Sequence, residues 1–302
     1  MAAQFEIQQE VAHGYLGSTE QNPLPPSSLF HRLVYVLRHS WMLRITLPIS
    51  VAALFLAAFG PTISPISLVS ATSAVDVPPS LNHLFGTDPS GLDVFWRVLA
   101  APRIDVTIAI ASTLLSVVIG SMIGLVTSFF RGPAAEFVMR TSDLVQAFPL
   151  FVLAIIFVVM TGRSYANIIL IISLLNIPIY LRLIRSEVLS LRTRTFVEAA
   201  YANGDHGLSI AFRHVLPNAI APALAQAPVT LGYSILVIAG LSFIGAGVQP
   251  PTPEWGSMIA TGANGIIIGQ WWPSVFPGVV LSITVFSFAA MGEALQTAVF
   301  RR

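Results

Sequence analysis

Long apolar runs without a formal charge dominate this chain of 302 residues and limit the folds that it can adopt. Hydrophobic residues make up 55% of the sequence and charged residues 10%, whereas a typical soluble domain has about 25% charged residues. A helix needs about 20 mostly apolar residues to cross the hydrocarbon core of a bilayer. The composition therefore predicts an all-α integral membrane protein.

Six segments are long and apolar enough to span a membrane. They cover residues 45–63, 107–130, 144–162, 164–181, 219–243 and 274–294. Pro250, Pro251 and Pro253 separate the last two, because a proline has no N–H group and interrupts a helix. The first segment begins too far from Met1, and is too long, for a cleaved signal peptide, so it is predicted to remain as a signal anchor.

The distribution of arginine predicts how the spans are oriented, because cytoplasmic loops carry an excess of basic residues. Twelve of the fifteen arginines lie in the N-terminal tail, in the loops 131–140 and 182–213, or at the C-terminus. The other three are Arg97, Arg103 and Arg163. Both termini and the loop 182–213 are therefore predicted to be cytoplasmic. The alternative, in which that loop is embedded in the membrane, costs about 2.5–3.5 kcal/mol for each arginine at a helix centre.

The chain contains no lysine and no cysteine. A Walker A loop requires a lysine, so the chain is not expected to hold ATP in a P-loop, and disulfides and thiol chemistry are excluded. The six histidines lie outside the predicted spans and none has a carboxylate at ligand spacing, so no metal site is expected. Asp105, Asp143 and Glu293 lie near span ends, where snorkelling or helix capping explains them.

The most informative polar segment is the loop 182–217 between the fourth and fifth spans. Its pattern is carried by Glu198, Ala199, Ala200, Gly204, Asp205, His214, Leu216 and Pro217. The alanines, placed where a helix is ending, leave room for another surface, Gly204 can adopt a positive φ, and Asp205 is placed to cap a second short helix. Pro217 then opens the next apolar run. We predict two short helices that dock another protein; the alternative is an ordinary solvated loop.

A second motif precedes the second span and follows His83. Its residues are Gly86, Thr87, Asp88, Gly91, Asp93 and Arg97. The glycines permit tight turns, and Asp88 and Ser90 are candidates to cap a short helix that runs into Val94. A capped helix at the membrane interface, with Trp96 in the aromatic belt, is sufficient by itself to explain this pattern.

A third motif follows the fifth span, within residues 241–256. It comprises Ser242, Phe243, Gly245, Gly247, Pro250, Pro251 and Trp255. The glycines permit close helix packing or an unwound end of a span, and the prolines force an extended turn. A helix terminus followed by an interfacial loop also explains most of these residues.

In their content and in their order along the chain, the three motifs closely resemble those of permease subunits from the dipeptide, oligopeptide and nickel branch of the binding-protein-dependent ABC importers. The resemblance is in particular to the C-type subunit. The resemblance covers roughly residues 30–298 and implies the type I importer permease fold with six transmembrane helices. It also implies that the loop 182–217 couples to an ATPase. Leu92 and Ile238 stand where the family usually has an arginine and often has an acidic residue, so the roles of those family side chains are not carried over.

The resemblance further implies an organisation and a set of partners. Residues 1–44 would form a cytoplasmic tail, 45–103 the first span and a periplasmic linker, and 104–298 the permease domain, in the cell inner membrane. The implied partners are a second homologous permease subunit, two ABC ATPase subunits that bind the ATP, an extracytoplasmic substrate-binding protein and the surrounding lipid bilayer. No cofactor, metal or nucleic acid is implied.

The implied function is the translocation of di- or oligopeptides, coupled to ATP hydrolysis on separate subunits, and the chain itself is not expected to be an enzyme. The alternative is the same architecture importing nickel, another small chelate or a glutathione-like compound. A secondary transporter would need ionisable groups at mid-membrane and often has an inverted repeat. A membrane enzyme would need convergent His, Asp or Cys groups at one interface. The sequence shows neither the features of a secondary transporter nor those of a membrane enzyme.

Overall fold

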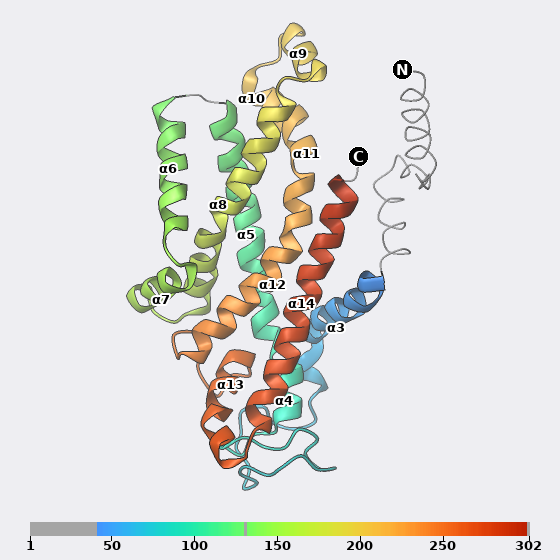
Figure 1. Cartoon of the computed structure of the whole chain (residues 1–302), viewed down its shortest axis with the longest axis vertical. Helices are drawn as coiled ribbons and strands as arrows, with labels where there is room; N and C mark the ends of the chain where they lie inside the picture. Colours follow the sequence, from blue (N-terminus) through green and yellow to red (C-terminus); the bar gives the residue numbers. More distant parts are fainter. Residues whose placement is uncertain (1–40, 130–131, 301–302) are drawn as a thin grey trace, which may run out of the picture.

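Figure 1 shows the computed structural model of the chain, which describes residues 41–129 and 132–300. The predicted N-terminal tail 1–44 therefore lies almost entirely outside the described residues. Within the described residues the regular elements are helices, and a single isolated antiparallel bridge joins Thr87 to Asp93.

The helices follow one another along the chain in the order that their labels give. They are α3 (Trp41–Ile63), α4 (Val94–Ala100), α5 (Pro102–Phe129), α6 (Pro133–Ala147), α7 (Leu150–Thr161), α8 (Tyr165–Leu191), α9 (Thr195–Ala202), α10 (Gly207–Ile210), the π-helix η1 (Ala211–Val215), α11 (Leu216–Ala219), α12 (Ala221–Phe243), α13 (Trp255–Ala263), the 3-10 helix η2 (Asn264–Ile268) and α14 (Trp272–Phe300).

Five of the described helical segments are long and apolar enough to cross a membrane: α3, α4 with α5, α8, α12 and α14. They confirm the first, second, fourth, fifth and sixth predicted spans, with shifted ends. In particular, α5 begins at Pro102 and α8 continues to Leu191. Residues 182–191, which the sequence assigned to the loop 182–217, are therefore the last turns of α8.

The third predicted span, 144–162, is wrong as a single helix. The chain forms α6 and α7 instead, and these meet at a bend of 97°. Pro149 lacks the N–H group that a continuing helix needs, and Phe148 before it is extended (φ −87°, ψ 144°), as a following proline favours. Taken together as one bent span, α6 and α7 are the sixth candidate to cross the membrane.

Helix α5 packs against α3, α8 and α12, and α12 packs against α14. Small residues bring α5 close to α8. A Cβ atom added at Gly120 would lie 2.7 Å from the Cβ of Tyr180, and one added at Gly124 would lie 2.6 Å from the carbonyl oxygen of Leu181. Close approach at small residues is the usual way in which helices associate in membranes, where the hydrophobic effect does not drive them together.

The bundle has two ends of different construction (Figure 1). The α9 end comprises residues 192–219, with the short helices between α8 and α12. The α13 end comprises residues 64–101 and 244–271, with the long loop after α3, helix α4 and helix α13. Between the ends, outer faces expose large apolar side chains such as Phe55, Val159 and Phe286, which suits contact with lipid tails.

Candidate functional site

Helix α9 lies at the tip of the α9 end and carries the Glu-Ala-Ala triplet (Figure 1). Glu198 and Ala199 are exposed, whereas Ala200 is buried. The triplet lies in the second half of this short helix, with Ala199 and Ala200 in its last turn, so a helix is ending there, as the sequence had indicated. It presents one carboxylate and one methyl group to the outside, so another protein can approach this face closely.

Gly204 adopts the positive φ predicted for it, 86°. The reversal that it allows lets the N–H of Asp205 donate to the carbonyl oxygen of Ala200 at 3.2 Å, just after the end of α9. Nothing lies within 4 Å of a Cβ atom built on Gly204. The preference for glycine at this position therefore comes from the backbone conformation alone.

The predicted cap at Asp205 is wrong. Helix α10 starts after His206, one residue later than expected, and His206 makes no capping hydrogen bond. The Asp205 carboxylate lies instead 3.5 Å from Nε2 of His214 in the π-helix η1. This partly exposed pair links the turn after α9 to the end of η1, just before α11.

A buried apolar cluster fixes the α9 end to the bundle. Its members from this end include Val197, Ala200, Ile210, Ala211, Val215 and Ala219, and they share the cluster with Leu125 of α5 and Ile184 of α8. Leu216 and Pro217 begin α11, where a proline in the first turn costs no helical hydrogen bond. A displacement of α9 therefore acts directly on the residues that pack against α5 and α8.

Opposite this cluster, the α9 end exposes four large apolar side chains. They are Phe196 (39% exposed), Tyr201 (52%), Leu208 (53%) and Phe212 (44%). We call these four side chains the apolar patch. They lie outside the predicted spans, and large apolar side chains left exposed there suit a contact with another protein.

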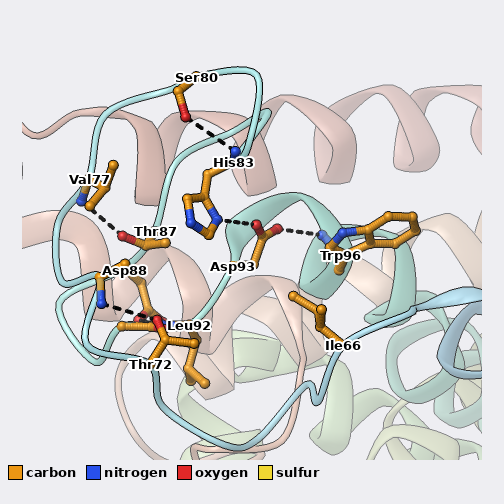
Figure 2. Close-up of polar contacts among 12 residues, drawn as sticks. Ile66, Thr72, Val77, Ser80, His83, Thr87, Asp88, Leu92, Asp93 and Trp96 are labelled. Atoms are coloured by element: carbon orange, nitrogen blue, oxygen red, sulfur yellow. Dashed lines mark hydrogen bonds and ion pairs between the residues drawn. The ribbon is translucent and has the colours of Figure 1, made fainter.

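At the α13 end, the loop 64–93 is held by its own hydrogen bonds (Figure 2). Gly86 and Gly91 both have a φ of 73°, in agreement with the predicted tight turns. The hydroxyl oxygen of Thr87 accepts the N–H of Val77 at 2.8 Å, and its carbonyl oxygen accepts the indole N–H of Trp272 at 3.0 Å. The loop is thereby attached to the start of α14.

Asp93 caps α4, whereas Asp88 and Ser90, the candidates from the sequence, do not. One carboxylate oxygen of Asp93 accepts the N–H of Trp96 at 3.1 Å (Figure 2). Asp88 accepts the N–H groups of Ser90 and Leu92, each at 2.9 Å, and so stabilises the turn that precedes the helix.

The second carboxylate oxygen of Asp93 lies 2.8 Å from Nδ1 of His83 (Figure 2). His83 and Asp93 therefore form a histidine–carboxylate pair. The sequence did not indicate this pair, because the two residues are ten positions apart. Within 41–129 and 132–300, no group of three or more His, Cys, Asp or Glu side chains could hold a metal ion.

The second and third sequence motifs meet at Arg97, which is 4% exposed. Its Nη1 donates to the carbonyl oxygens of Leu68 at 2.8 Å and of Pro251 at 2.9 Å. Hydrogen bonds from a charged donor are about twice as strong as those between neutral groups. Arg97 thus ties the loop 64–93 to the turn after α12, across a sequence separation of 154 residues that no local pattern could show.

The predicted unwound end of the fifth span is present. Gly245 has a φ of 77°, which reverses the chain. The N–H groups of Ala246 and Gly247 then donate to the carbonyl oxygen of Leu241, at 2.8 and 2.9 Å. Ser242 Oγ accepts the N–H of Val248 at 3.0 Å. These bonds satisfy backbone groups that the end of α12 would otherwise leave without partners.

The remaining residues of the third motif differ in their surroundings. Phe243 is exposed beside the end of α12, and the Pro250–Pro251 peptide bond is cis. Trp255 is fully buried, and its indole N–H donates to the carbonyl oxygen of Val98 at 3.1 Å. The tryptophan therefore joins α13 to α4.

A buried pair of acidic residues, which sequence reasoning missed, lies beside this contact. Asp105 does not snorkel: it is fully buried, and Oδ2 accepts the N–H of Trp255 at 3.1 Å. Glu254 caps α13 by accepting the N–H groups of Gly256 and Ser257 at 2.9 and 2.6 Å. Burial raises the pKa of Glu254 more than its hydrogen bonds lower it. The cap position before Trp255 could have indicated Glu254, but no local pattern indicates Asp105 as its neighbour.

Comparisons with known proteins indicate the family to which the chain belongs. Residues 116–302 match the family described as the binding-protein-dependent transport system inner membrane component. The glutathione transport system permease protein GsiD of Pectobacterium atrosepticum is 35% identical over 220 residues, 73% of each chain. The dipeptide transport system permease protein DppC of Alkalihalophilus pseudofirmus is 36% identical over 220 residues, 73% of this chain and 72% of the relative. The probable D,D-dipeptide transport system permease protein DdpC of Escherichia coli is 33% identical over 270 residues, 88% of this chain and 89% of the relative.

The regular elements of residues 41–129 and 132–300 are helices that form a membrane bundle, and the family match makes this the type I importer permease fold. The chain belongs to the family of binding-protein-dependent transport system inner membrane components, the permease subunits of ABC importers, which are not themselves catalytic. The resemblance seen in the three sequence motifs is thereby confirmed.

Proposed function

We propose that this subunit forms part of the pathway through which an ABC importer carries di- or oligopeptides into the cell. The observation that carries the proposal is the α9 end, where an exposed carboxylate and the apolar patch lie on short helices packed against α5 and α8. The names of the relatives, which include dipeptide and glutathione transport, support a peptide as the substrate.

In the proposed arrangement the chain lies in the inner membrane with the α9 end and both termini in the cytoplasm. The five arginines between residues 182 and 213 support this orientation. A second homologous permease subunit completes the pathway, and two ATPase subunits bind the ATP beneath it. A substrate-binding protein delivers the peptide to the α13 end, where the residues of the second motif, Gly86 to Arg97, would position the loop that receives it. The subunit itself needs no cofactor.

Coupling in this arrangement is the transmission of a rigid-body movement. Helix α9 is seated in a cleft of the ATPase, with Glu198 accepting a charge-assisted hydrogen bond and the apolar patch filling the contact. Closure of the ATPase dimer moves α9. Because Val197 and Ile210 pack in one cluster with Leu125 of α5 and Ile184 of α8, the movement reaches the spans.

Two substitutions separate docking from coupling. Gly204→Val forces a β-branched residue into positive φ at a cost of about 1–3 kcal/mol, and we expect it to weaken co-purification of the ATPase. Glu198→Gln keeps the shape and removes the charge, so the complex should assemble while peptide uptake falls about tenfold. Glu187→Gln, an acidic position on α8 outside the α9 end, is the matched control. Normal assembly and normal uptake with both variants would remove the role of this loop.

Orientation is tested with single cysteines, which the cysteine-free chain allows. Asp205→Cys should react with an impermeant maleimide only after the cells are opened. Leu81→Cys, in the loop 64–93 and 97% exposed, should react in intact cells whose outer barrier is permeable to the reagent. Labelling of position 205 from outside contradicts the orientation.

The substrate is tested with the assembled transporter in liposomes. We expect dipeptides, with their binding protein, to stimulate ATP hydrolysis and to accumulate inside. Stimulation by a nickel chelate, with none by dipeptides, would favour the alternative substrate class and leave the permease assignment intact.

A further inference from the structure

A groove between α5, α6 and α8 changes its character along its length. Toward the α9 end, a cavity of about 280 Å³ is lined by polar side chains that include Arg185 and Arg192. A second cavity, of about 190 Å³, is lined almost wholly by apolar side chains. On α5, Ile123 lines the apolar cavity and Thr127, one helical turn further on, lines the polar one. On α8, Leu181 and Arg185 are related in the same way. The two cavities are therefore successive parts of one groove.

The two arginines are held in place by the end of α5. Nη1 of Arg185 donates to the carbonyl oxygen of Thr127 at 2.7 Å, and Nη1 of Arg192 donates to that of Ser128 at 3.3 Å. A guanidinium group has five N–H donors, so each arginine keeps donors for a ligand. In the part of the chain that the structure describes, neither arginine forms an ion pair.

The first turn of α6 borders the same cavity and adds to its attraction for an anion. Gly132 precedes the helix without a side-chain cap, so the N–H groups of Ala134 and Ala135 are not satisfied by capping. The helix also directs the positive end of its dipole toward the cavity. Glu136 lines the cavity as well, but Arg140 pairs with it at 2.9 Å and offsets its charge.

The apolar cavity has the lining that a hydrocarbon chain requires. Val138 and Val145 come from α6, and Leu174 and Leu181 come from α8. Two side chains of this lining carry a hydroxyl group, Thr141 and Ser142, and that of Thr141 donates to the carbonyl oxygen of Phe137 at 2.9 Å.

We propose that this groove binds an anionic phospholipid, with its phosphate at Arg185 and Arg192 and one acyl chain in the apolar cavity. A soluble phosphate would use only the first part of the groove, and an uncharged lipid would not use the arginines. Basic pockets between spans are established places for anionic headgroups. Because Arg192 caps the end of α8, immediately before α9, the lipid would also brace the point where the span enters the loop.

The test uses the full chain purified in detergent and measures bound lipid by native mass spectrometry. Phosphatidylglycerol should bind in preference to phosphatidylcholine with the same acyl chains. Each arginine is expected to contribute about fivefold, so the double substitution Arg185→Gln with Arg192→Gln should weaken phosphatidylglycerol binding about 30-fold. Arg213→Gln, an exposed arginine at the same end of the bundle but outside the lining of both cavities, is the matched control and should change nothing.

A second variant separates the possible sources of the phosphate. Val145→Phe fills the apolar cavity and leaves both arginines, so it should weaken phosphatidylglycerol binding while thermal unfolding in detergent stays normal. Two results together would show that the site takes a soluble phosphate. Inorganic phosphate at millimolar concentration would displace the lipid, and Val145→Phe would have no effect on lipid binding. Equal binding of the two lipids, or full binding by the double variant, would overturn the proposal. None of these outcomes depends on what the transporter carries.

Discussion

The two ends of the bundle are held together by different interactions. At the α13 end, buried side chains donate hydrogen bonds to backbone carbonyl oxygens of other segments: Arg97 to Pro251, Trp255 to Val98 and Trp272 to Thr87. At the α9 end, the segments are joined mainly by apolar packing, and the Asp205–His214 pair is partly exposed. Large apolar side chains are exposed at both ends, among them Tyr201 and Leu208 at the α9 end and Leu81 and Ile267 at the α13 end.

This difference indicates which end has its geometry fixed by hydrogen bonds within the chain. A buried hydrogen bond to a carbonyl fixes both a distance and a direction, and losing it leaves the carbonyl without a partner. The α13 end therefore has its geometry set by its own residues. Apolar packing sets distances but not directions, so the segments of the α9 end are held less specifically.

The largest expected effect is at Arg97. Arg97→Met keeps the length of the side chain but leaves the carbonyl oxygens of Leu68 and Pro251 without a donor, so the free energy of unfolding should fall by about 3 kcal/mol. The measurement is denaturant unfolding of the purified chain in mixed micelles. Arg140→Met, on the exposed face of α6, is the control, with an expected change below about 0.5 kcal/mol. A loss at Arg97 as small as the control's would erase the contrast between the ends.

Two glycines with positive φ compare the ends directly. At Gly86, a Cβ atom would lie 2.5 Å from the carbonyl oxygen of Val77 and 2.6 Å from Cδ1 of Trp272, whereas at Gly204 it would meet nothing within 4 Å. Gly86→Ala should therefore cost about 3 kcal/mol, from backbone strain and overpacking, and Gly204→Ala about 1 kcal/mol, from strain alone. Equal losses in the same unfolding assay would show that the α13 end is no more tightly packed.

A smaller effect concerns pH and Glu254. Burial raises the pKa of this carboxyl above its ordinary value of 4.5, so the folded protein holds the proton at a pH where the unfolded chain releases it. Stability from this group is therefore complete below its ordinary pKa and is lost as the pH rises through the raised value. We expect the melting temperature of the wild type to fall with rising pH and this slope to flatten in Glu254→Gln. Glu136→Gln removes an exposed acid and is the control, so it should keep the wild-type slope. If Glu254→Gln also keeps the wild-type slope, the buried carboxyl does not titrate and the prediction is wrong.

The smallest effect is expected at Asp205. Asp205→Asn removes the charge from a partly exposed pair, and such pairs contribute about 0.5 kcal/mol or less. Thermal unfolding of the isolated chain should therefore be unchanged within error. A loss above about 1 kcal/mol would mean that the α9 end, like the α13 end, depends on a specific polar contact.

Local features were predicted well where a property of a few neighbouring residues decides the outcome. Hydropathy placed five of the spans, and the glycines at 86, 91 and 204 have the positive φ that their turns require. The bend at Phe148–Pro149 could also have been predicted, because a proline within an apolar run prevents a continuous hydrogen-bond ladder.

The helix caps show where such reasoning fails. Asp88, Ser90 and Asp93 all lie within six residues, and only the exact starting point of α4 decides that Asp93 is the cap. At the α9 end, a shift of one residue moves the start of α10 past Asp205 and frees its carboxylate for His214. Sequence offers several capping residues of the same kind, and tertiary packing sets the register that selects one.

By itself, the sequence determined that this chain is a helical membrane protein, where its main turns lie and which loop carries the Glu-Ala-Ala triplet. Each of these follows from local hydropathy, backbone preference or residue order. The tertiary structure alone decided that Arg97 reaches Pro251, that Asp105 is buried against the backbone of Trp255, and that Arg185 and Arg192 share a groove with an apolar cavity. These pairings depend on the path of the chain between distant residues, because side chains that far apart in sequence meet only when the helices between them have packed.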